Sequence, residues 1–355
     1  MNRISTFDEQ KVNDIISKYF DVTLISKNNN SYQFKILGLK DGDKVSSAFV
    51  KLYKESFKIS FNVALRKENN ELMLYMVKKE SRIKKSVVIG LAIATLITVY
   101  ISGLDFKTIN TGFAWSPFAY LIGLIIPLLI HEAGHWITMR RYNVPASPPY
   151  LLPAPPLQFG FLGTFGAVIN MEWVPPTNDI LALTGVMGPL FGFLAAIPFA
   201  FIGLKYSTLM PYSPVSSSTI SLVPLILSII TYVEKIPQGY IIQPSAMMFA
   251  SYIVFFITFL NLIPVSQLDG GHVLRAALGE RGHYVASQIF IVALILAGIW
   301  YSTFALFGIF VLFIFLITRG KHPGAAMESN KISYKGLSAV IIYCLLLILT
   351  LPLPS

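Results

Sequence analysis

The chain has 355 residues, of which 54% are hydrophobic and only 13% are charged, about half the charged fraction of folded soluble domains. This composition excludes an ordinary soluble protein, and a single cysteine, Cys344, excludes a disulfide framework. The net charge of +10 would suit a nucleic-acid partner, but the basic residues gather at the ends of apolar runs, as Arg140 and Arg141 do. That placement is typical of cytoplasmic loops. We therefore predict an integral membrane protein that contacts membrane lipid and has no nucleic-acid partner.

Residues 1–82 are the polar, lysine-rich beginning of the chain. Apolar residues at helical spacing predict a helix over residues 8–20. Short alternating or β-branched stretches predict strands over residues 32–37, 57–63 and 72–77. We predict that residues 1–82 form a small cytoplasmic α+β domain and that residues 83–355 form a transmembrane domain.

Long apolar runs fill the rest of the chain, and a helix needs about 20 apolar residues to cross a bilayer. Residues 284–318 are long enough for two helices with a tight turn near residues 300–303. Residues 221–233 are too short to cross and predict a half-span or interfacial helix. The predicted fold class is mainly α, a polytopic membrane protein with about seven transmembrane helices. Besides the two helices of residues 284–318, the five predicted transmembrane helices are residues 87–104, 117–139, 180–204, 245–265 and 337–353.

The charges also predict an orientation. If Lys85 is cytoplasmic, then Arg140, Arg141 and Arg275 lie inside as well, provided that residues 221–233 do not cross. We expect a plasma-membrane protein with its N-terminus in the cytoplasm and its C-terminus on the opposite face. Cys344 lies inside an apolar run and is expected to be buried.

Residues 144–171 are apolar but cannot form a continuous helix, because six prolines fall between Pro145 and Pro156. Irregular backbone at membrane depth is tolerated only where protein or a water-filled cavity covers it. Glycine and β-branched or aromatic residues over 159–169 predict a re-entrant hairpin. A proline-rich cytoplasmic loop is the alternative.

Residues 131–135 read HEAGH near the cytoplasmic end of the second long apolar run. His131 and His135 are four residues apart, so both imidazoles project from one helix face and can bind the same zinc ion. Glu132 points to the adjoining side, where it can take a proton from metal-bound water. A chance pairing in a core helix is the plain alternative. It is disfavoured because the chain has only five histidines and because ionisable groups at bilayer depth are costly.

A catalytic zinc site usually has three protein ligands and a water, so one more ligand is needed. Asp269 closes the fourth long apolar run and lies on the same predicted side as His135. The alternatives are that Asp269 only caps a helix before Gly270 and Gly271, or that His272 is the ligand. His283 and His322 fall in predicted polar loops and are not expected to bind metal.

HEAGH in one helix, followed by NLIPVSQLDGG (residues 261–271) in a later one, resembles the site-2 protease family of intramembrane zinc metalloproteases. The stretch LGTFGAVI (residues 162–169) further resembles its archaeal and chloroplast branch. The resemblance covers about residues 86–353. It implies a three-helix zinc protease core with one zinc ion per chain, held by His131, His135 and Asp269, and with Glu132 as the general base.

The same resemblance implies roles in substrate binding. Asn261 matches an asparagine that holds the substrate backbone or the oxyanion. The hairpin is implied to pair with an unwound substrate through Gly163, Thr164, Phe165 and Gly166. The chain lacks a recognisable PDZ module, so ideas about substrate selection in bacterial relatives do not transfer.

The implied function is hydrolysis of peptide bonds in or near transmembrane segments of membrane proteins, as in regulated intramembrane proteolysis. One rival is a prenyl-protein endopeptidase with Glu172 as third ligand, which is disfavoured because Glu172 lies among prolines rather than on a following helix. A non-proteolytic metal-binding transporter or scaffold stays open as an alternative, although metal binding alone does not need Glu132. The sequence leaves the substrate, the cut position, the role of residues 1–82 and the oligomeric state open.

Overall fold

The computed structural model describes residues 3–28, 30–40, 44–79, 85–107, 115–211, 222–237, 239–328 and 331–354. The predicted domain boundary between residues 82 and 83, and residue 221 at the start of the predicted half-span, lie outside the described residues.

Residues 3–79 form an antiparallel sheet with two helices, and the strand order is β1-β2-β4-β3. Alternate side chains of the inner strands, such as Phe34 and Leu74, meet Phe49 of α2 in a fully buried core. The elements are α1 (Arg3–Ile16), β1 (Phe20–Asn28), β2 (Ser31–Leu39), α2 (Val45–Ser56), β3 (Phe61–Glu68) and β4 (Glu71–Lys78).

Two local predictions in this unit need correction. The helix predicted over residues 8–20 ends too late, because α1 ends at Ile16 and Phe20 begins strand β1. The strand predicted over residues 57–63 begins too early, because Phe57–Ile59 is a 3-10 turn that ends at Ser60 with φ 60°. Strand β1 and helix α2 were not predicted. In β1 nearly every residue after Phe20 is exposed, so the strand lacks the apolar alternation from which a sequence reading starts.

The remaining residues form a bundle of helices with three short strand pairs. The helices are α3 (Lys85–Gly103), α4 (Ser116–Arg141), α5 (Asn178–Lys205), α6 (Leu225–Val233), α7 (Ala246–Leu262), α8 (Asp269–Ala297), α9 (Ser302–Thr318) and α10 (Tyr334–Thr350). The pairs are β5 (Tyr150–Pro153) with β6 (Thr164–Val168), β7 (Thr208–Pro211) with β9 (Tyr240–Gln243), and β8 (Leu222–Pro224) with β10 (Pro352–Pro354).

Within the part of the chain that the structure describes, three helices are long and apolar enough to cross a membrane: Lys85–Phe106, Ser116–Arg141 and Asn178–Lys205. Helices α7, α9 and α10 are apolar but have 17 residues each. The predicted pair of helices over residues 284–318 is present as the end of α8 and α9, with the turn at residues 298–301. The total of seven spans and the half-span stay predictions.

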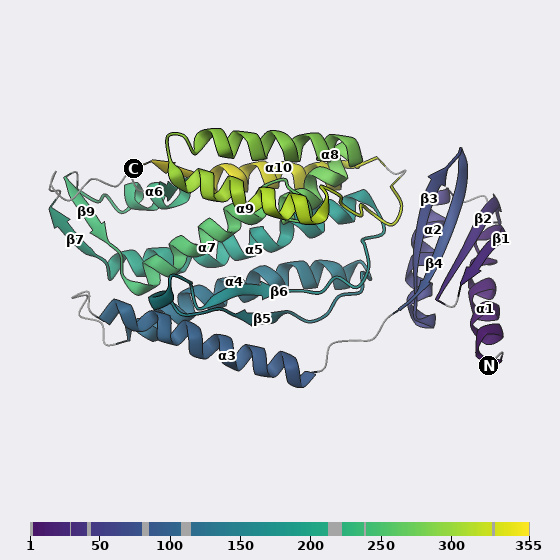
Figure 1. Ribbon diagram of the computed structural model, residues 1–355, viewed down its shortest axis with the longest axis horizontal. Helices are drawn as coiled ribbons and strands as arrows, with labels where there is room; N and C mark the ends of the chain where they lie inside the picture. Colours follow the sequence, from purple (N-terminus) through teal and green to yellow (C-terminus); the bar gives the residue numbers. More distant parts are fainter. Residues whose placement is uncertain are drawn as a thin grey trace.

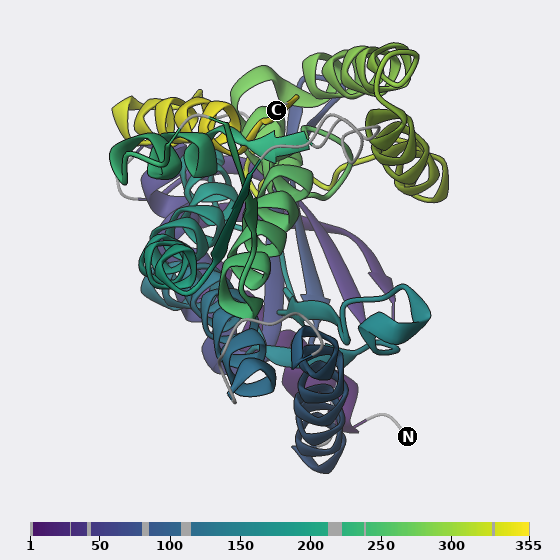
Figure 2. The same ribbon diagram turned by 90° about the vertical axis from the view of Figure 1, so that its left-hand side faces the viewer.

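Helix α5 is the centre of the bundle, where it contacts α4, α7, α8 and α10. Its inner side chains, such as Val186, Ala196 and Ala200, are fully buried. Helix α3 lies at the periphery and exposes Ile89 and Ile97, as expected of a helix that faces lipid. Viewed from the end of the bundle (Figure 2), α3 and the α8–α9 pair lie at opposite edges.

The sheet of residues 3–79 lies at one end of the bundle, and β7, β9, α6 and the C-terminus lie at the other end (Figure 1). At the near end, Tyr53 donates a hydrogen bond to the carbonyl of Val174, and the indole of Trp173 donates one to the carbonyl of Val63. Burial raises the pKa of Tyr53, which keeps its hydroxyl protonated as a donor. The core of the sheet unit also includes Ala326 and Met327 from beyond α9.

The proline-rich segment forms the β5–β6 hairpin against α3. Thr98 donates a hydrogen bond to the carbonyl of Gly163 (2.6 Å), and Tyr120 of α4 donates one to the carbonyl of Leu162. A side chain at Gly163 would collide with Ser102 and with the backbone of α3, and φ at this glycine is 82°. Glycine is therefore required where the hairpin meets α3. The hairpin predicted over residues 159–169 begins too late, because this range contains only β6 and its partner β5 lies at Tyr150–Pro153. That the hairpin is re-entrant stays a prediction.

Candidate active site

Two helices bring the three predicted metal ligands together. Helix α4 carries His131 and His135 one turn apart on its buried face, and it begins with Pro117, which is suited to a first helical turn. Helix α8 begins at Asp269, where a carboxylate is favoured by the helix dipole. Helix α5 packs between them, touching both α4 and α8.

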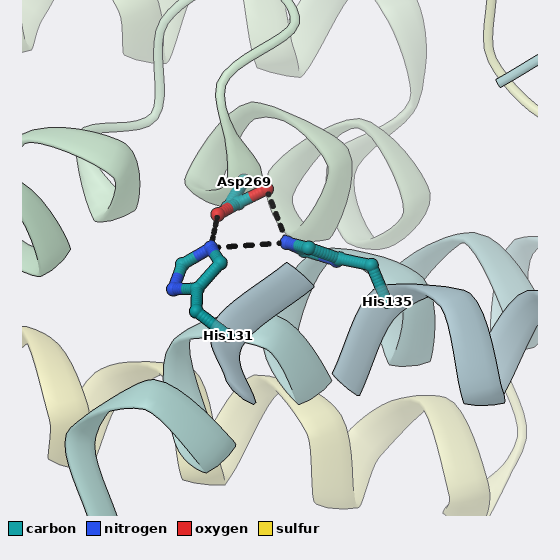
Figure 3. A group of neighbouring side chains, drawn as sticks. All are labelled: His131, His135 and Asp269. Atoms are coloured by element: carbon teal, nitrogen blue, oxygen red, sulfur yellow. Dashed lines mark hydrogen bonds and ion pairs between the residues drawn. The ribbon is translucent and has the colours of Figure 1, made fainter. Parts of the chain in front are cut away.

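The three side chains meet through the two Nε2 atoms and both carboxylate oxygens of Asp269 (Figure 3). Nε2 of His131 lies 3.2 Å from Oδ2 of Asp269, and Nε2 of His135 lies 3.3 Å from Oδ1. The two Nε2 atoms are 3.2 Å apart. Among the described residues this is the group of histidine, cysteine and carboxylate side chains that converges as a metal site would.

The triangle has the size that zinc requires. Zinc binds imidazole nitrogen and carboxylate oxygen at about 2.0–2.2 Å with tetrahedral angles, which places neighbouring ligand atoms about 3.3–3.6 Å apart. The observed separations of 3.2–3.3 Å lie at or just below the lower limit of that range. A tetrahedral ion held by the two Nε2 atoms and one oxygen of Asp269 would keep a fourth position for water or substrate.

A backbone carbonyl orients one of the imidazoles. Nδ1 of His135 lies 2.6 Å from the carbonyl oxygen of Thr184 in α5. Because a carbonyl oxygen can only accept, Nδ1 carries the proton, and in the neutral imidazole Nε2 presents its lone pair toward Asp269 and His131. This is the arrangement in which a group behind the ligand fixes the tautomer and the ring. Converging lone pairs repel one another unless a cation lies between them.

Three glycines of α5 make room for the ligands. A Cβ at Gly188 would lie 2.0 Å from Nε2 of His135, and one at Gly192 would lie 2.7 Å from Cβ of His131. A Cβ at Gly185 would lie 2.6 Å from the backbone oxygen of Asp269. Gly134 of α4 lies equally close to the backbone of Met187. Small residues at such spacing allow membrane helices to approach closely, and here that approach places the ligands.

Glu132 lies beside the triangle without being part of it. Its Oε1 is 3.9 Å from Nε2 of His131, which is wider than the spacing between tetrahedral ligand atoms but suits contact with a water in the fourth position. The side chains of His131 and His135 are 5% and 8% exposed, whereas those of Glu132 and Asp269 are 12% and 15% exposed. The carboxylates therefore line the more accessible side of a largely buried site.

The other predicted site residues belong to α7 and to the β5–β6 hairpin. Asn261 is half-buried in the last turn of α7. Thr164 holds the hairpin through a hydrogen bond to the carbonyl of Leu152, and Gly166 N–H donates to its hydroxyl. The side chain of Phe165 is 66% exposed. Glu172, the rival third ligand, instead forms an ion pair with Lys79 of the sheet unit.

Three further histidines form a second cluster, and one expectation about them is wrong. His283 lies on α8 rather than in a polar loop, and it is 1% exposed. Nε2 of His322 lies 2.8 Å from Nδ1 of His272, and the N–H of Gly324 donates to Nδ1 of His322. Burial lowers the pKa of His322, so its neutral ring accepts from Gly324 and donates to His272.

Sequence reasoning missed Thr184, the α5 glycines and the contact between His272 and His322. A backbone carbonyl has no sequence signature, so Thr184 could not be found. The glycines left a signal, because Gly185, Gly188 and Gly192 recur at helical spacing in an apolar run.

Comparisons with known proteins point to one family. The family model described as peptidase family M50 matches residues 119–301. The probable zinc metalloprotease EGY1 of Oryza sativa subsp. japonica, chloroplastic, is 28% identical over 174 residues, which cover 46% of this chain and 28% of that protein. A zinc metalloprotease of Methanocaldococcus jannaschii is 25% identical over 192 residues, which cover 54% of this chain and 42% of that protein.

The probable zinc metalloprotease EGY2 of Arabidopsis thaliana, chloroplastic, is 22% identical over 249 residues, 67% of this chain and 42% of that protein. The chain thus spans less than half of the length of these curated relatives. No solved structure matches the chain. All three atoms of the metal triangle come from residues inside the family match.

Proposed function

Because the chain belongs to peptidase family M50, a membrane-embedded family of site-2 proteases, we propose that it is an intramembrane zinc endopeptidase. It hydrolyses peptide bonds in or near transmembrane segments of membrane proteins, as in regulated intramembrane proteolysis. The observation that carries the proposal is the triangle of His131, His135 and Asp269 with the carboxylate of Glu132 beside it.

The three residues of the triangle hold one zinc ion per chain. When bound there, zinc polarises the scissile carbonyl and lowers the pKa of a water to about 7. Asp269 supplies the negative charge that a divalent cation favours, and the carbonyl of Thr184 keeps the Nε2 lone pair of His135 directed at the site.

Glu132 moves the proton. Its carboxylate accepts a proton from the attacking water and donates it to the amine that leaves when the peptide bond breaks. The burial of the histidines supports this role, because a proton shuttle works best where bulk water does not compete for the proton.

Asn261 and the β6 strand hold the substrate. The amide of Asn261 donates to the substrate backbone or to the oxyanion. Gly163 precedes β6, and Thr164, Phe165 and Gly166 belong to it. Strand β5 covers one edge of this two-stranded sheet, which leaves the other edge of β6 for the substrate. An unwound substrate segment that adds to this edge has its backbone amides satisfied at membrane depth.

The whole chain is proposed as a cytoplasmic α+β domain over residues 1–82 and a transmembrane metalloprotease domain over residues 83–355. The latter has about seven spans, a half-span at α6 and a re-entrant hairpin. The nine residues of α6 rise only about 14 Å, which supports the half-span. The protein is proposed to lie in the plasma membrane with its N-terminus in the cytoplasm.

Glu132→Gln tests the function, because glutamine keeps the shape of glutamate but cannot carry the proton. We expect a variant that folds, inserts and binds zinc as the wild type does. It should cleave a reporter with a transmembrane segment about 10²–10⁴-fold more slowly. Glu234→Gln, the same change at an exposed position after α6, should leave the rate unchanged.

The alternative is a non-proteolytic metal-binding transporter or scaffold. It predicts zinc binding without reporter cleavage in the wild type. Near-wild-type cleavage by Glu132→Gln would refute the mechanism even if the protein is a protease.

A further inference from the structure

The edge of the N-terminal sheet continues into the helical bundle. The N–H of Leu65, on the edge strand β3, donates to the carbonyl of Ala326 at 2.8 Å, and Leu65 pairs in parallel with Met327. On its other side the same segment donates from Ala326 to the carbonyl of Pro175 and pairs with Thr177. Residues 325–327 thus lie as a strand between β3 and the residues that lead into α5. We call residues 322–328 the clasp loop.

One arginine of β3 binds the clasp loop. Nη1 of Arg66 donates to the carbonyls of Ala326 (2.7 Å) and Ala325 (2.9 Å), and Nη2 lies 3.8 Å from the carboxylate of Glu328. That carboxylate also accepts from Arg275 of α8 at 2.9 Å. Hydrogen bonds from a charged donor are the stronger ones, so Arg66 and Arg275 fix the loop between the sheet and α8.

The other end of the clasp loop reaches the first turn of α8, the helix that begins at Asp269. His322 accepts from Gly324 within the loop and donates to His272. His272 lies in the first turn of α8, three residues after Asp269. Its Cβ is also close enough to α5 that a side chain at Gly185 would strike it.

The N-terminal sheet is therefore linked to both α5 and α8, the helices that hold Thr184 and Asp269. Through residues 175–177 it fixes the start of α5, whose Thr184 orients His135. Through His322 it fixes the first turn of α8, whose Asp269 joins the two histidines. Arg66 and the clasp loop lie outside the residues that the family model matches.

We propose that Arg66 and His322 are positioning residues for the metal triangle, so that the docked N-terminal sheet is part of the zinc site's supporting structure. The proposal rests on the proposed function, because it assumes that the triangle binds zinc. The plain alternative is that the interface only tethers residues 3–79 to the bundle and that the metal site is complete without it.

The metal affinity of the full-length protein in detergent distinguishes the positioning role from a simple tether. This measurement does not depend on the cleavage of any substrate. The wild type should bind one Co²⁺ with the visible absorption of a tetrahedral site, and Zn²⁺ should displace it. Zn²⁺ affinity is then measured by competition with a chelating indicator. Arg66→Ala and His322→Ala should each weaken this affinity about tenfold. This is the lower end of the range for removing a group that hydrogen-bonds a metal ligand directly, because both residues act on the ligands through other residues.

Three variants make the test specific. Lys35→Ala removes an exposed ion pair with Glu71 from the same sheet and should leave affinity unchanged. His322→Gln, whose amide both accepts and donates, should restore most of what His322→Ala loses. Tyr53→Phe deletes one hydrogen bond to the bundle and provides a milder loosening if Arg66→Ala does not fold.

Docking is followed in the same samples by the fluorescence of Trp173, with the other three tryptophans replaced by phenylalanine in every variant. If the fluorescence of Trp173 shows that a variant has undocked while its Zn²⁺ affinity stays at the wild-type value, the proposal is overturned. The interface would then only tether residues 3–79 to the bundle. An equal loss of affinity in Lys35→Ala would also overturn it, as general instability. A wild type that binds neither Co²⁺ nor Zn²⁺ would instead overturn the proposed function.

Discussion

At the scale of single residues, the chemistry of the site depends on how one carboxylate faces two imidazoles. Oδ1 and Oδ2 of Asp269 each face a different Nε2 atom. His272, which the sequence left as a rival ligand, faces the other way and bonds to His322. The i,i+4 spacing of the histidines predicted their pairing, because it depends only on helix geometry. The choice between Asp269 and His272 depends on the direction in which α8 leaves its first turn, which the sequence does not specify.

Asp269→Ala removes one of the three proposed ligands. We expect zinc content near zero after dialysis and an affinity more than about 100-fold weaker, since even groups behind the ligands cost about 10–100-fold. Elemental analysis and indicator competition measure both. Asp14→Ala, at an exposed position of α1, is the control. Unchanged zinc stoichiometry in Asp269→Ala would remove this residue from the ligand set.

At the scale of elements, α5 supplies no metal ligand. Its contribution is glycines, which leave room for the neighbouring helices because they have no side chain. Its glycines let α4 and α8 approach until the side chains of His131, His135 and Asp269 meet. An apolar run with glycines was read correctly as a long membrane helix, but which glycine faces which neighbour depends on helix rotation. The strands at residues 32–37 and 72–77 were predicted because one face is buried, as at Phe34 and Leu74. The exposed β1 gave no such signal.

Gly188→Ala tests this role of α5. In an ordinary helix the change would stabilise by about 1 kcal/mol, but here the new Cβ would lie 2.0 Å from Nε2 of His135. We expect zinc affinity to fall by at least about 10–100-fold, with reporter cleavage lost in parallel. Gly90→Ala in α3, where nothing lies within 4 Å, should retain both. If Gly188→Ala keeps wild-type affinity, the close approach of α5 is not needed for the site.

At the scale of the whole molecule, the sequence predicted a mainly helical membrane protein with a polar N-terminal part. It could not predict that this part docks on residues 322–328, because Arg66 and Ala326 are 260 residues apart and meet through backbone carbonyls. Cys344 also corrects an expectation, since it is exposed rather than buried. A cysteine in an apolar run gives no indication of whether it faces protein or lipid.

The proposed topology puts Lys54 and Lys321 on the cytoplasmic side and Lys235 on the opposite side, and all three are exposed. Single cysteines at these positions, in a Cys344→Ser background, can be labelled with an impermeant thiol reagent in vesicles of known orientation. We expect Lys54→Cys and Lys321→Cys to react from one side and Lys235→Cys from the other. Labelling of Lys54→Cys and Lys321→Cys from opposite sides would contradict both the span count and the docking of β3.

The pairing of β3 with residues 325–327 has a consequence for how the protein is made. The partner of this strand is translated about 260 residues after it, which takes roughly 13–50 s at ribosomal speeds of about 5–20 residues per second. During that time the strand emerges with one edge unpaired, and unpaired edges are prone to association with other chains. The newly made sheet therefore keeps an open edge until residues 325–327 are made, and the lysines of the N-terminal unit help to keep it soluble during that interval.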